Sequence, residues 1–295
     1  MLVVAMLAAV AACSSETNPT TSTTVGSSAT ATTTTTRPPS TTVTTAPTST
    51  STLTSTSATT APAGPGPHGV EAYLPSRPEE APVAVLVHGG GWVAGLPASM
   101  EPLGRALADR GMVVFNASYR TLMAGGGYPD TFDDIACAVR YARSEASRLG
   151  ASKDVTLVGH SAGAHIAAVV ALTDDTFGGD CPWEGSSVPE RWVGLAGIYR
   201  LSAVEPVMEA LLGGDRQTVP DAWAAADPFE HLAAADDVDM VVVHGIDDEI
   251  VPASSSREFA LALRDGGVEV TLEVLEGTNH MDMLDPDVTA ALIAP

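Results

Sequence analysis

The sequence has 295 residues, a net charge of −22 and three cysteines, and its length fits one large domain or two small ones. Glu16 is the only acidic residue before Glu71, so nearly all of the negative charge lies after residue 70. An acidic surface of this kind repels phosphate backbones, which argues against nucleic acid as a partner.

The chain begins with an apolar run over residues 2–12, which is too short to span a bilayer and suits the core of a signal peptide. The run ends in Val10–Cys13 (V-A-A-C), which resembles the lipobox of bacterial lipoproteins. In that family the signal is cut before the cysteine, and the cysteine carries the lipid. We therefore predict a signal peptide over 1–12, a lipid anchor on Cys13 and export to the outer face of the cell membrane. No Lys or Arg precedes the run, so a secreted form stays open.

Thr and Ser account for 29 of the 41 residues from 20 to 60, and Pro and Ala make up most of the rest. Such a segment has little apolar surface to bury and does not repay the entropy of ordering. We predict that residues 13–66 form a disordered Thr/Ser/Pro-rich linker, and that one domain occupies residues 67–295.

Within that domain, apolar runs alternate with segments of helical spacing. The expected strands cover residues 70–74, 82–87, 112–117, 155–158, 192–198, 240–244 and 268–275. The expected helices cover residues 102–110, 130–149, 164–172 and 254–264, and a further stretch after Asp285. This alternation predicts an α/β fold with a doubly wound, mostly parallel sheet. Residues 200–239 interrupt it with short helical pieces, which predict either a small lid or a plain surface excursion.

The segment Gly159–Gly163 (G-H-S-A-G) lies between an expected strand and an expected helix. In this context a G-x-S-x-G turn pushes its serine, here Ser161, out above the edge of the sheet. The serine then sits at the N-terminus of a helix, where free N–H groups favour developing negative charge. The pattern has three fixed positions and carries little weight alone.

Three further motifs follow expected strands, where ligands bind in sheets of this type. His88–Trp92 (H-G-G-G-W) follows the strand at 82–87, and its glycines leave backbone N–H groups free for an oxyanion hole. His244–Pro252 (H-G-I-D-D-E-I-V-P) follows the strand at 240–244, and Glu276–His280 (E-G-T-N-H) follows the strand at 268–275. Serine, acid and histidine therefore occur in that order, each just past a strand.

With these motifs the chain resembles α/β-hydrolases of the esterase branch from about residue 70 to the C-terminus. It is similar to carboxylesterases of the hormone-sensitive-lipase-like, feruloyl/acetyl-xylan-esterase-like and kynurenine-formamidase-like groups. The order Ser-acid-His is that of α/β-hydrolases. The resemblance implies Ser161 as nucleophile and His280 as general base and then acid. It also implies an oxyanion hole made by backbone N–H groups of Gly90, Gly91 and Ala162, with the N–H of Trp92 as a possible substitute.

The acid of this triad must be chosen among neighbours. Family members show H-G-x-x-D-x-x-V-P, and that register selects Asp248, with Val251 and Pro252 following. Asp247 and Glu249 are then solvated loop acids. One carboxylate within reach of the imidazole is what a triad requires.

The other histidines, His88, His160, His165 and His244, are expected to pack or to make local hydrogen bonds. The motifs require no metal and no cofactor, because the sequence lacks H-E-x-x-H and its acidic clusters lack the spacing of a calcium loop. Tyr119-Arg120 resembles a pair that is usually structural in this family.

If Cys13 carries a lipid, Cys137 and Cys181 remain as an even pair in an oxidising compartment. We predict a disulfide between them, and two buried free thiols are the alternative.

These features predict a serine hydrolase that cleaves carboxylic esters through an acyl-enzyme, with a small-molecule or polysaccharide-linked ester as substrate and short acyl groups favoured. Two alternatives stay open. The run from Gly159 to His165 resembles kynurenine formamidases, which cleave an N-formyl amide. The other alternative is an inactive surface-anchored binding protein, because a fold does not by itself imply an activity.

Overall fold

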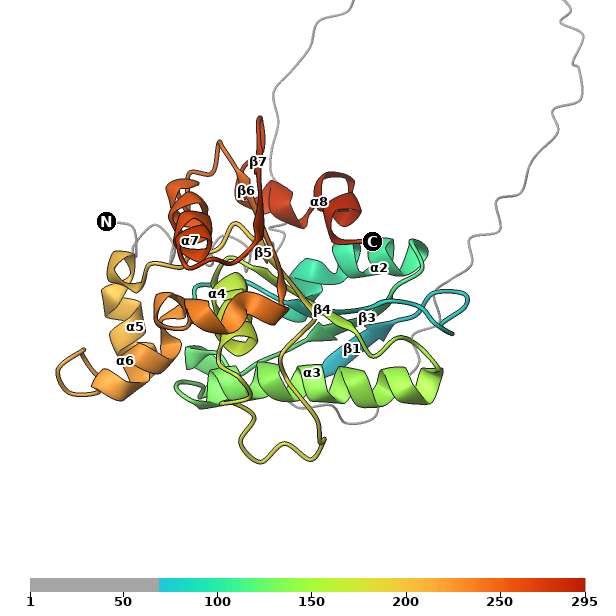
Figure 1. The fold of residues 1–295 in the computed structure, drawn as a ribbon, viewed down its shortest axis with the longest axis horizontal. Coiled ribbons are helices and arrows are strands. Elements are labelled where there is room, and N and C mark those ends of the chain that lie inside the picture. The colour runs from blue at the N-terminus through green and yellow to red at the C-terminus, as the bar shows by residue number, and fades with distance from the viewer. Residues whose placement is uncertain (1–68, 295) are drawn as a thin grey trace, which may run out of the picture.

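The structure, a computed structural model, describes residues 69–294 (Figure 1). The predicted signal peptide over 1–12, the lipidated Cys13 and the linker over 13–66 lie outside the described residues. So do the first two residues of the predicted domain at 67–295.

Seven strands form one sheet in the order β1-β3-β2-β4-β5-β6-β7. Their bounds are β1 (Val70–Tyr73), β2 (Val83–Val87), β3 (Val113–Ala117), β4 (Val155–His160), β5 (Arg191–Leu195), β6 (Asp239–Gly245) and β7 (Val270–Leu275). Strand β1 is antiparallel to β3, and every other pair is parallel. All residues of β2 and β3 are buried, which explains why these strands are continuous apolar runs in the sequence.

Helices cover both faces of the sheet (Figure 1). The α-helices are α2 (Glu101–Asp109), α3 (Asp130–Leu149), α4 (Ala162–Leu172), α5 (Glu205–Leu212), α6 (Pro220–Ala226), α7 (Ser254–Asp265) and α8 (Pro286–Ile293). One apolar core holds side chains of α3, α4 and α7, and the other holds side chains of α2 and α8. In the described part of the chain, no helix combines the length and hydropathy needed to cross a membrane.

The prediction of a doubly wound, mostly parallel α/β sheet is therefore confirmed, and most element bounds agree within a few residues. The strand expected over 192–198 is wrong at its end, because β5 stops at Leu195. Ala196 has a φ of 49°, a left-handed conformation that leaves the extended path of a strand. Helix α3 has the predicted bounds and ends at Gly150, whose φ of 72° stops the helix.

Residues 200–239 contain helical pieces and reach strand geometry only at β6, where Asp239 is the first residue. Besides α5 and α6 they include η3 (Leu201–Ala203), η4 (Pro228–Glu230) and η5 (Leu232–Asp237). Further short turns of this type are η1 (Pro97–Met100), η2 (Leu122–Ala124) and η6 (Met281–Leu284). Helices α5 and α6 stand beside the sheet in Figure 1, and α6 contacts α4.

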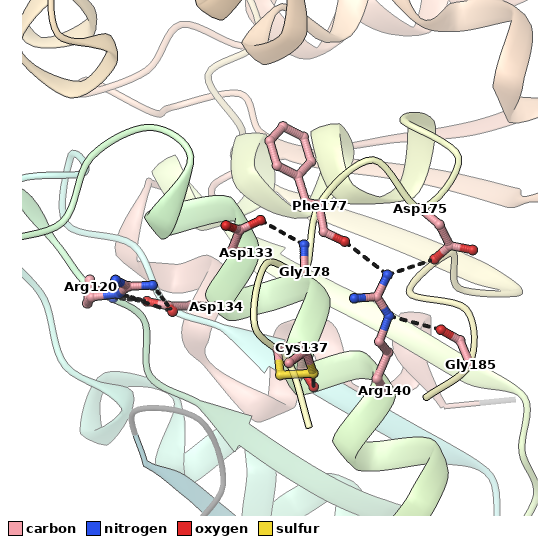
Figure 2. Close-up of a disulfide and its surroundings, with 10 residues drawn as sticks. Arg120, Asp133, Asp134, Cys137, Arg140, Asp175, Phe177, Gly178 and Gly185 are labelled. Atoms are coloured by element: carbon pink, nitrogen blue, oxygen red, sulfur yellow. Dashed lines mark hydrogen bonds and ion pairs between the residues drawn. A yellow bond between two sulfur atoms is a disulfide. The ribbon is translucent and has the colours of Figure 1, made fainter. Parts of the chain in front are cut away.

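The long loop between α4 and β5 is fastened to α3 by a disulfide between Cys137 and Cys181, whose Cα atoms are 5.4 Å apart (Figure 2). Arg140 of α3 donates to the carbonyl oxygens of Phe177 at 3.0 Å and Gly185 at 2.9 Å. A loop without helix or strand is thus tied down by side chains of one helix, which satisfy its backbone groups.

Candidate active site

Ser161 forms the turn between β4 and α4 in a strained conformation. Its φ of 55° and ψ of −121° are rarely adopted by a residue other than glycine, and such strain costs about 1–3 kcal/mol and gathers at functional sites. The turn is packed so closely that a Cβ on Gly163 would lie 2.3 Å from the carbonyl oxygen of Val87. Only glycine fits at 163, and the serine between β4 and α4 is held at the carboxyl edge of the sheet.

Asp248 and His280 come from the loops after β6 and β7 and meet beside this turn. Nδ1 of His280 lies 2.7 Å from Oδ2 of Asp248, and both side chains are buried. Because a carboxylate accepts hydrogen bonds, Nδ1 carries the proton and donates it. Nε2 of the neutral imidazole is then the unprotonated nitrogen, as a general base requires.

Three other groups hold the Asp248 carboxylate. Its Oδ1 accepts from the backbone N–H groups of Ile250 at 2.8 Å and Val251 at 2.7 Å, and Nε2 of His244 lies 3.1 Å from Oδ2. Burial favours the protonated carboxyl, but hydrogen bonds from His244 and His280 outweigh it and hold the pKa of Asp248 below its usual value. Asp248 is therefore ionised at neutral pH.

His160 places the backbone of His280 next to the serine. Its Nε2 donates to the carbonyl oxygen of His280 at 3.1 Å, and the two ring centroids are 4.7 Å apart. Burial lowers the pKa of His160 to about 3, so this ring is neutral. Among residues 69–294, no hydrogen bond joins Oγ of Ser161 to Nε2 of His280; such bonds are often long before substrate binds.

The glycine-rich loop after β2 lies against the serine. A Cβ on Gly89 would be 3.1 Å from Cβ of Ser161. The backbone N–H groups of residues 89–92 donate to no acceptor within residues 69–294, and neither does that of Ala162, the first residue of α4. The backbone donors of Gly90, Gly91 and Ala162 are therefore unused within residues 69–294, as the donors of an oxyanion hole must be before substrate binds.

The remaining predicted residues lie around this site. His88 is buried and stacked on Tyr119, and burial lowers its pKa to about 4. Arg120 makes an ion pair with Asp134 at 2.7 Å, a structural contact. In the described part of the chain, no group of three or more His, Cys, Asp or Glu side chains is arranged to hold a metal ion.

Two contacts in the site were not predicted. The sequence analysis expected only packing or local hydrogen bonds for His244 and His160, but His244 contacts the acid and His160 contacts the base. For His244 a signal existed, because it stands four residues before Asp248 in one tight loop. For His160 none existed, because its partner lies 120 residues away.

The sequence profile of the BD-FAE family matches residues 70–263. The chain belongs to the BD-FAE family. The matched segment contains the H-G-G-G-W loop, Ser161 and Asp248 and ends before His280, so His280 is placed by the structure rather than by the profile. The expected resemblance to α/β-hydrolase esterases is confirmed.

Two curated relatives are esterases by name. A probable isoprenylcysteine alpha-carbonyl methylesterase of Oryza sativa subsp. japonica is 28% identical over 74% of this BD-FAE chain and 56% of its own length. Esterase LipQ of Mycobacterium tuberculosis is 27% identical over 78% of this chain and 58% of its own length. The chain thus spans less than two thirds of either relative.

A solved structure agrees with this assignment. The butyrate-bound esterase Est2 of Thermogutta terrifontis is 27% identical, with a TM-score of 0.62. The match covers 72% of this chain and 79% of Est2. The two chains share a fold, which in the BD-FAE chain is a mostly parallel sheet with helices on both faces.

Proposed function

We propose that this BD-FAE protein is a serine hydrolase that cleaves carboxylic esters, with Ser161 as nucleophile, His280 as base and acid, and Asp248 as the group that orients His280. The observation that carries the proposal is the 2.7 Å contact between His280 Nδ1 and Asp248 Oδ2. It leaves Nε2 of His280 as the free basic nitrogen, beside a serine in a strained turn.

In the proposed reaction, Nε2 of His280 takes the proton of Ser161 while the hydroxyl oxygen attacks the ester carbonyl. The resulting oxyanion is held by N–H groups of Gly90, Gly91 and Ala162, and each such donor contributes about 3 kcal/mol in the transition state. The imidazolium, stabilised by Asp248, then protonates the leaving alcohol. Water repeats the sequence on the acyl-enzyme and releases the acid.

The proposed substrates are esters with a short acyl group. The names of the relatives support an ester, since one is a methylesterase and one an esterase, and a butyrate-bound structure supports a short acyl group. An N-formyl amide is the alternative, and the same triad would serve it. The ratio of kcat/KM for a p-nitrophenyl ester and an N-formyl anilide separates the two.

The test compares wild-type protein with Ser161→Ala on p-nitrophenyl esters from acetate to palmitate and on acetylated xylan. We expect turnover of the short esters by the wild type and a loss of at least about a thousandfold in Ser161→Ala, because no other group forms the acyl-enzyme. Ser147→Ala is the matched control, since Ser147 is an exposed serine on α3 that bonds only the Arg143 carbonyl. Equal turnover in wild type and Ser161→Ala would contradict the proposal.

We also propose that the protein is exported and anchored through a lipid on Cys13, supported by the apolar run before it and the V-A-A-C ending. The anchor is tested in the native host by labelling with a fatty-acid analogue. Wild type should be labelled and remain with the membrane fraction, whereas Cys13→Ala should not. Labelling of Cys13→Ala, or no labelling of the wild type, would contradict the anchor.

A further inference from the structure

His165 is a fully buried residue of α4, one helical turn beyond Ser161, and both of its ring nitrogens have partners. Nε1 of Trp92 donates to Nδ1 of His165 at 3.1 Å, and Nε2 of His165 lies 2.8 Å from the carbonyl oxygen of Ala226. An indole N–H only donates and a carbonyl only accepts, so one tautomer fits, with the proton on Nε2. A charged imidazole would lose the bond from Trp92.

Trp92 is the last residue of the glycine-rich loop and has a strained backbone. Its φ is 61°, next to Gly91 at 61° and Gly90 at 126°. A large side chain adopts such a φ only where its surroundings impose it. Here the imposing contacts are on the side chain: the indole is completely buried, and its ring meets that of His165 edge to face with centroids 5.3 Å apart.

His165 in turn is held from two further directions. Its bond to Ala226 connects it to the last residue of α6, in the segment 200–239. Phe132 of α3 packs against the ring at 6.0 Å, and Phe177 stacks on Phe132 at 5.1 Å. Phe177 belongs to the loop that the disulfide fastens to α3 (Figure 2). These contacts hold the imidazole of His165 in one position. Because its Nδ1 accepts the indole N–H of Trp92, the indole is held in position too.

We propose that His165 is a positioning residue, which holds the N–H groups of Gly90 and Gly91 toward Ser161 by accepting the indole N–H of Trp92. The same imidazole connects the glycine-rich loop to the segment 200–239 through Ala226, so the packing of α6 bears on the geometry of the oxyanion donors. This role rests on the proposed function, because it concerns transition-state stabilisation at the same serine.

The consequence differs from that of a merely structural contact. Oxyanion donors act on the transition state more than on bound substrate, so misplacing them lowers kcat and leaves KM nearly unchanged. An error of about 1 Å in such a group costs up to about a hundredfold in rate. Burial lowers the pKa of His165 to about 4, so its neutral form and its acceptor nitrogen persist at neutral pH.

The experiment uses Trp92→Phe, which removes the N–H and keeps a buried ring, together with His165→Phe and the double variant. We expect each single variant to lower kcat for p-nitrophenyl butyrate by roughly tenfold to a hundredfold, with KM within about threefold of wild type. The double variant should lose no more than the worse single variant, because both remove one interaction. Affinity for a trifluoromethyl ketone, whose oxyanion occupies the same hole, should fall in parallel with kcat.

His231→Phe is the matched control. His231 also bonds a carbonyl oxygen of α6, that of Ala224 at 3.0 Å, but it is a half-exposed residue that does not contact Trp92. Its kcat should equal that of wild type. Wild-type kcat in both Trp92→Phe and His165→Phe, independent losses that multiply in the double variant, or an equal loss in His231→Phe would each overturn the proposal.

A second measurement needs neither a variant nor turnover. In 15N spectra of the wild-type protein, we expect Nδ1 of His165 to be unprotonated and Nε2 protonated from pH 5 to pH 8, with a slowly exchanging indole N–H on Trp92. The opposite tautomer or a charged ring would overturn the positioning role. Absence of ester turnover in a wild type with the expected spectrum would instead count against the proposed function alone.

Discussion

His244 donates from Nε2 to Oδ2 of Asp248 at 3.1 Å, the same carboxylate oxygen that His280 meets. The proton of His244 must lie on Nε2, because the carbonyl oxygen of Val251 is also 2.9 Å from that nitrogen. Its Nδ1 lies 2.7 Å from the hydroxyl oxygen of Ser256. One buried histidine thus fixes the direction in which the acid faces the catalytic imidazole.

We therefore expect His244→Phe to lower kcat about tenfold, because Asp248 loses a donor that orients it toward His280. The variant should also lose about 1–3 kcal/mol of unfolding free energy, since buried partners of His244 are left without a hydrogen bond. Ester kinetics and urea denaturation measure the two effects. Ser256→Ala keeps the imidazole and should retain most of kcat, and an unchanged kcat in His244→Phe would show that Asp248 needs no second imidazole.

The buried histidines predict an acid-sensitive fold. Burial lowers the pKa of His88 and His165 to about 4 and that of His160 to about 3, from an ordinary value near 6.5. At a pH between the folded-state pKa and the ordinary pKa, the histidine is protonated in the unfolded chain but not in the folded chain. The free energy of unfolding therefore falls as the pH drops from about 6.5 to 4. Each such histidine contributes about 1.4 kcal/mol per pH unit in that window.

Urea denaturation at pH 7, 6 and 5 measures this slope. His88→Gln should reduce this slope by about 1.4 kcal/mol per pH unit, because glutamine binds no proton when the chain unfolds. Ser147→Ala, which removes no titrating group, should leave the slope unchanged. A wild-type unfolding free energy that is constant from pH 7 to pH 5 would contradict the assignment of these rings as buried and neutral.

Much of the fold follows from local sequence. Helix α3 has amphipathic spacing, acidic residues in its first turn and a glycine at its end, and its bounds were predictable from these features. The central strands β2 and β3 were recognisable because burial on both faces demands an unbroken apolar run. The end of β5 could not be recognised in this way, because alanine does not favour the left-handed backbone conformation that Ala196 adopts.

The site divides in the same way. Ser161, the acid loop and the glycine-rich loop carry local motifs, which place each group at the carboxyl end of a strand. The bond between Trp92 and His165 joins residues 73 apart, and that between His160 and His280 joins residues 120 apart. Contacts of this range depend on how the layers pack, and one sequence does not encode them in a readable pattern.

The disulfide between Cys137 and Cys181 should contribute about 2–4 kcal/mol to stability, because it closes a loop of 44 residues in the unfolded chain. The double variant Cys137→Ala/Cys181→Ala should show a lower Tm than wild type and no response to dithiothreitol. Wild type should fall to the Tm of the variant when reduced. An equal Tm for oxidised wild type and double variant would contradict a stabilising bridge.

The turn at Ser161 should tolerate no side chain at Gly163. A Cβ there would lie within 2.4 Å of the carbonyl oxygens of Val87 and His88, so Gly163→Ala should abolish folding or activity. A Cβ on Gly89 would lie 2.9 Å from Nδ1 of His160, 3.1 Å from Cβ of Ser161 and 3.2 Å from the backbone oxygen of His160, which is less severe, so Gly89→Ala should stay folded with reduced kcat. Gly266→Ala is the control, since its nearest neighbour is 3.3 Å away and its φ is −77°. Wild-type kcat in Gly163→Ala would contradict this packing.

The central claim is that Ser161 is a nucleophile activated by His280 and Asp248. A fluorophosphonate probe followed by peptide mass spectrometry tests it most directly, because the probe reacts with an activated serine and marks its position. We expect one labelled peptide carrying the adduct on Ser161, and loss of labelling in His280→Ala and in heat-unfolded protein. Labelling at another serine, equal labelling of His280→Ala, or no labelling of the folded wild type would contradict the claim.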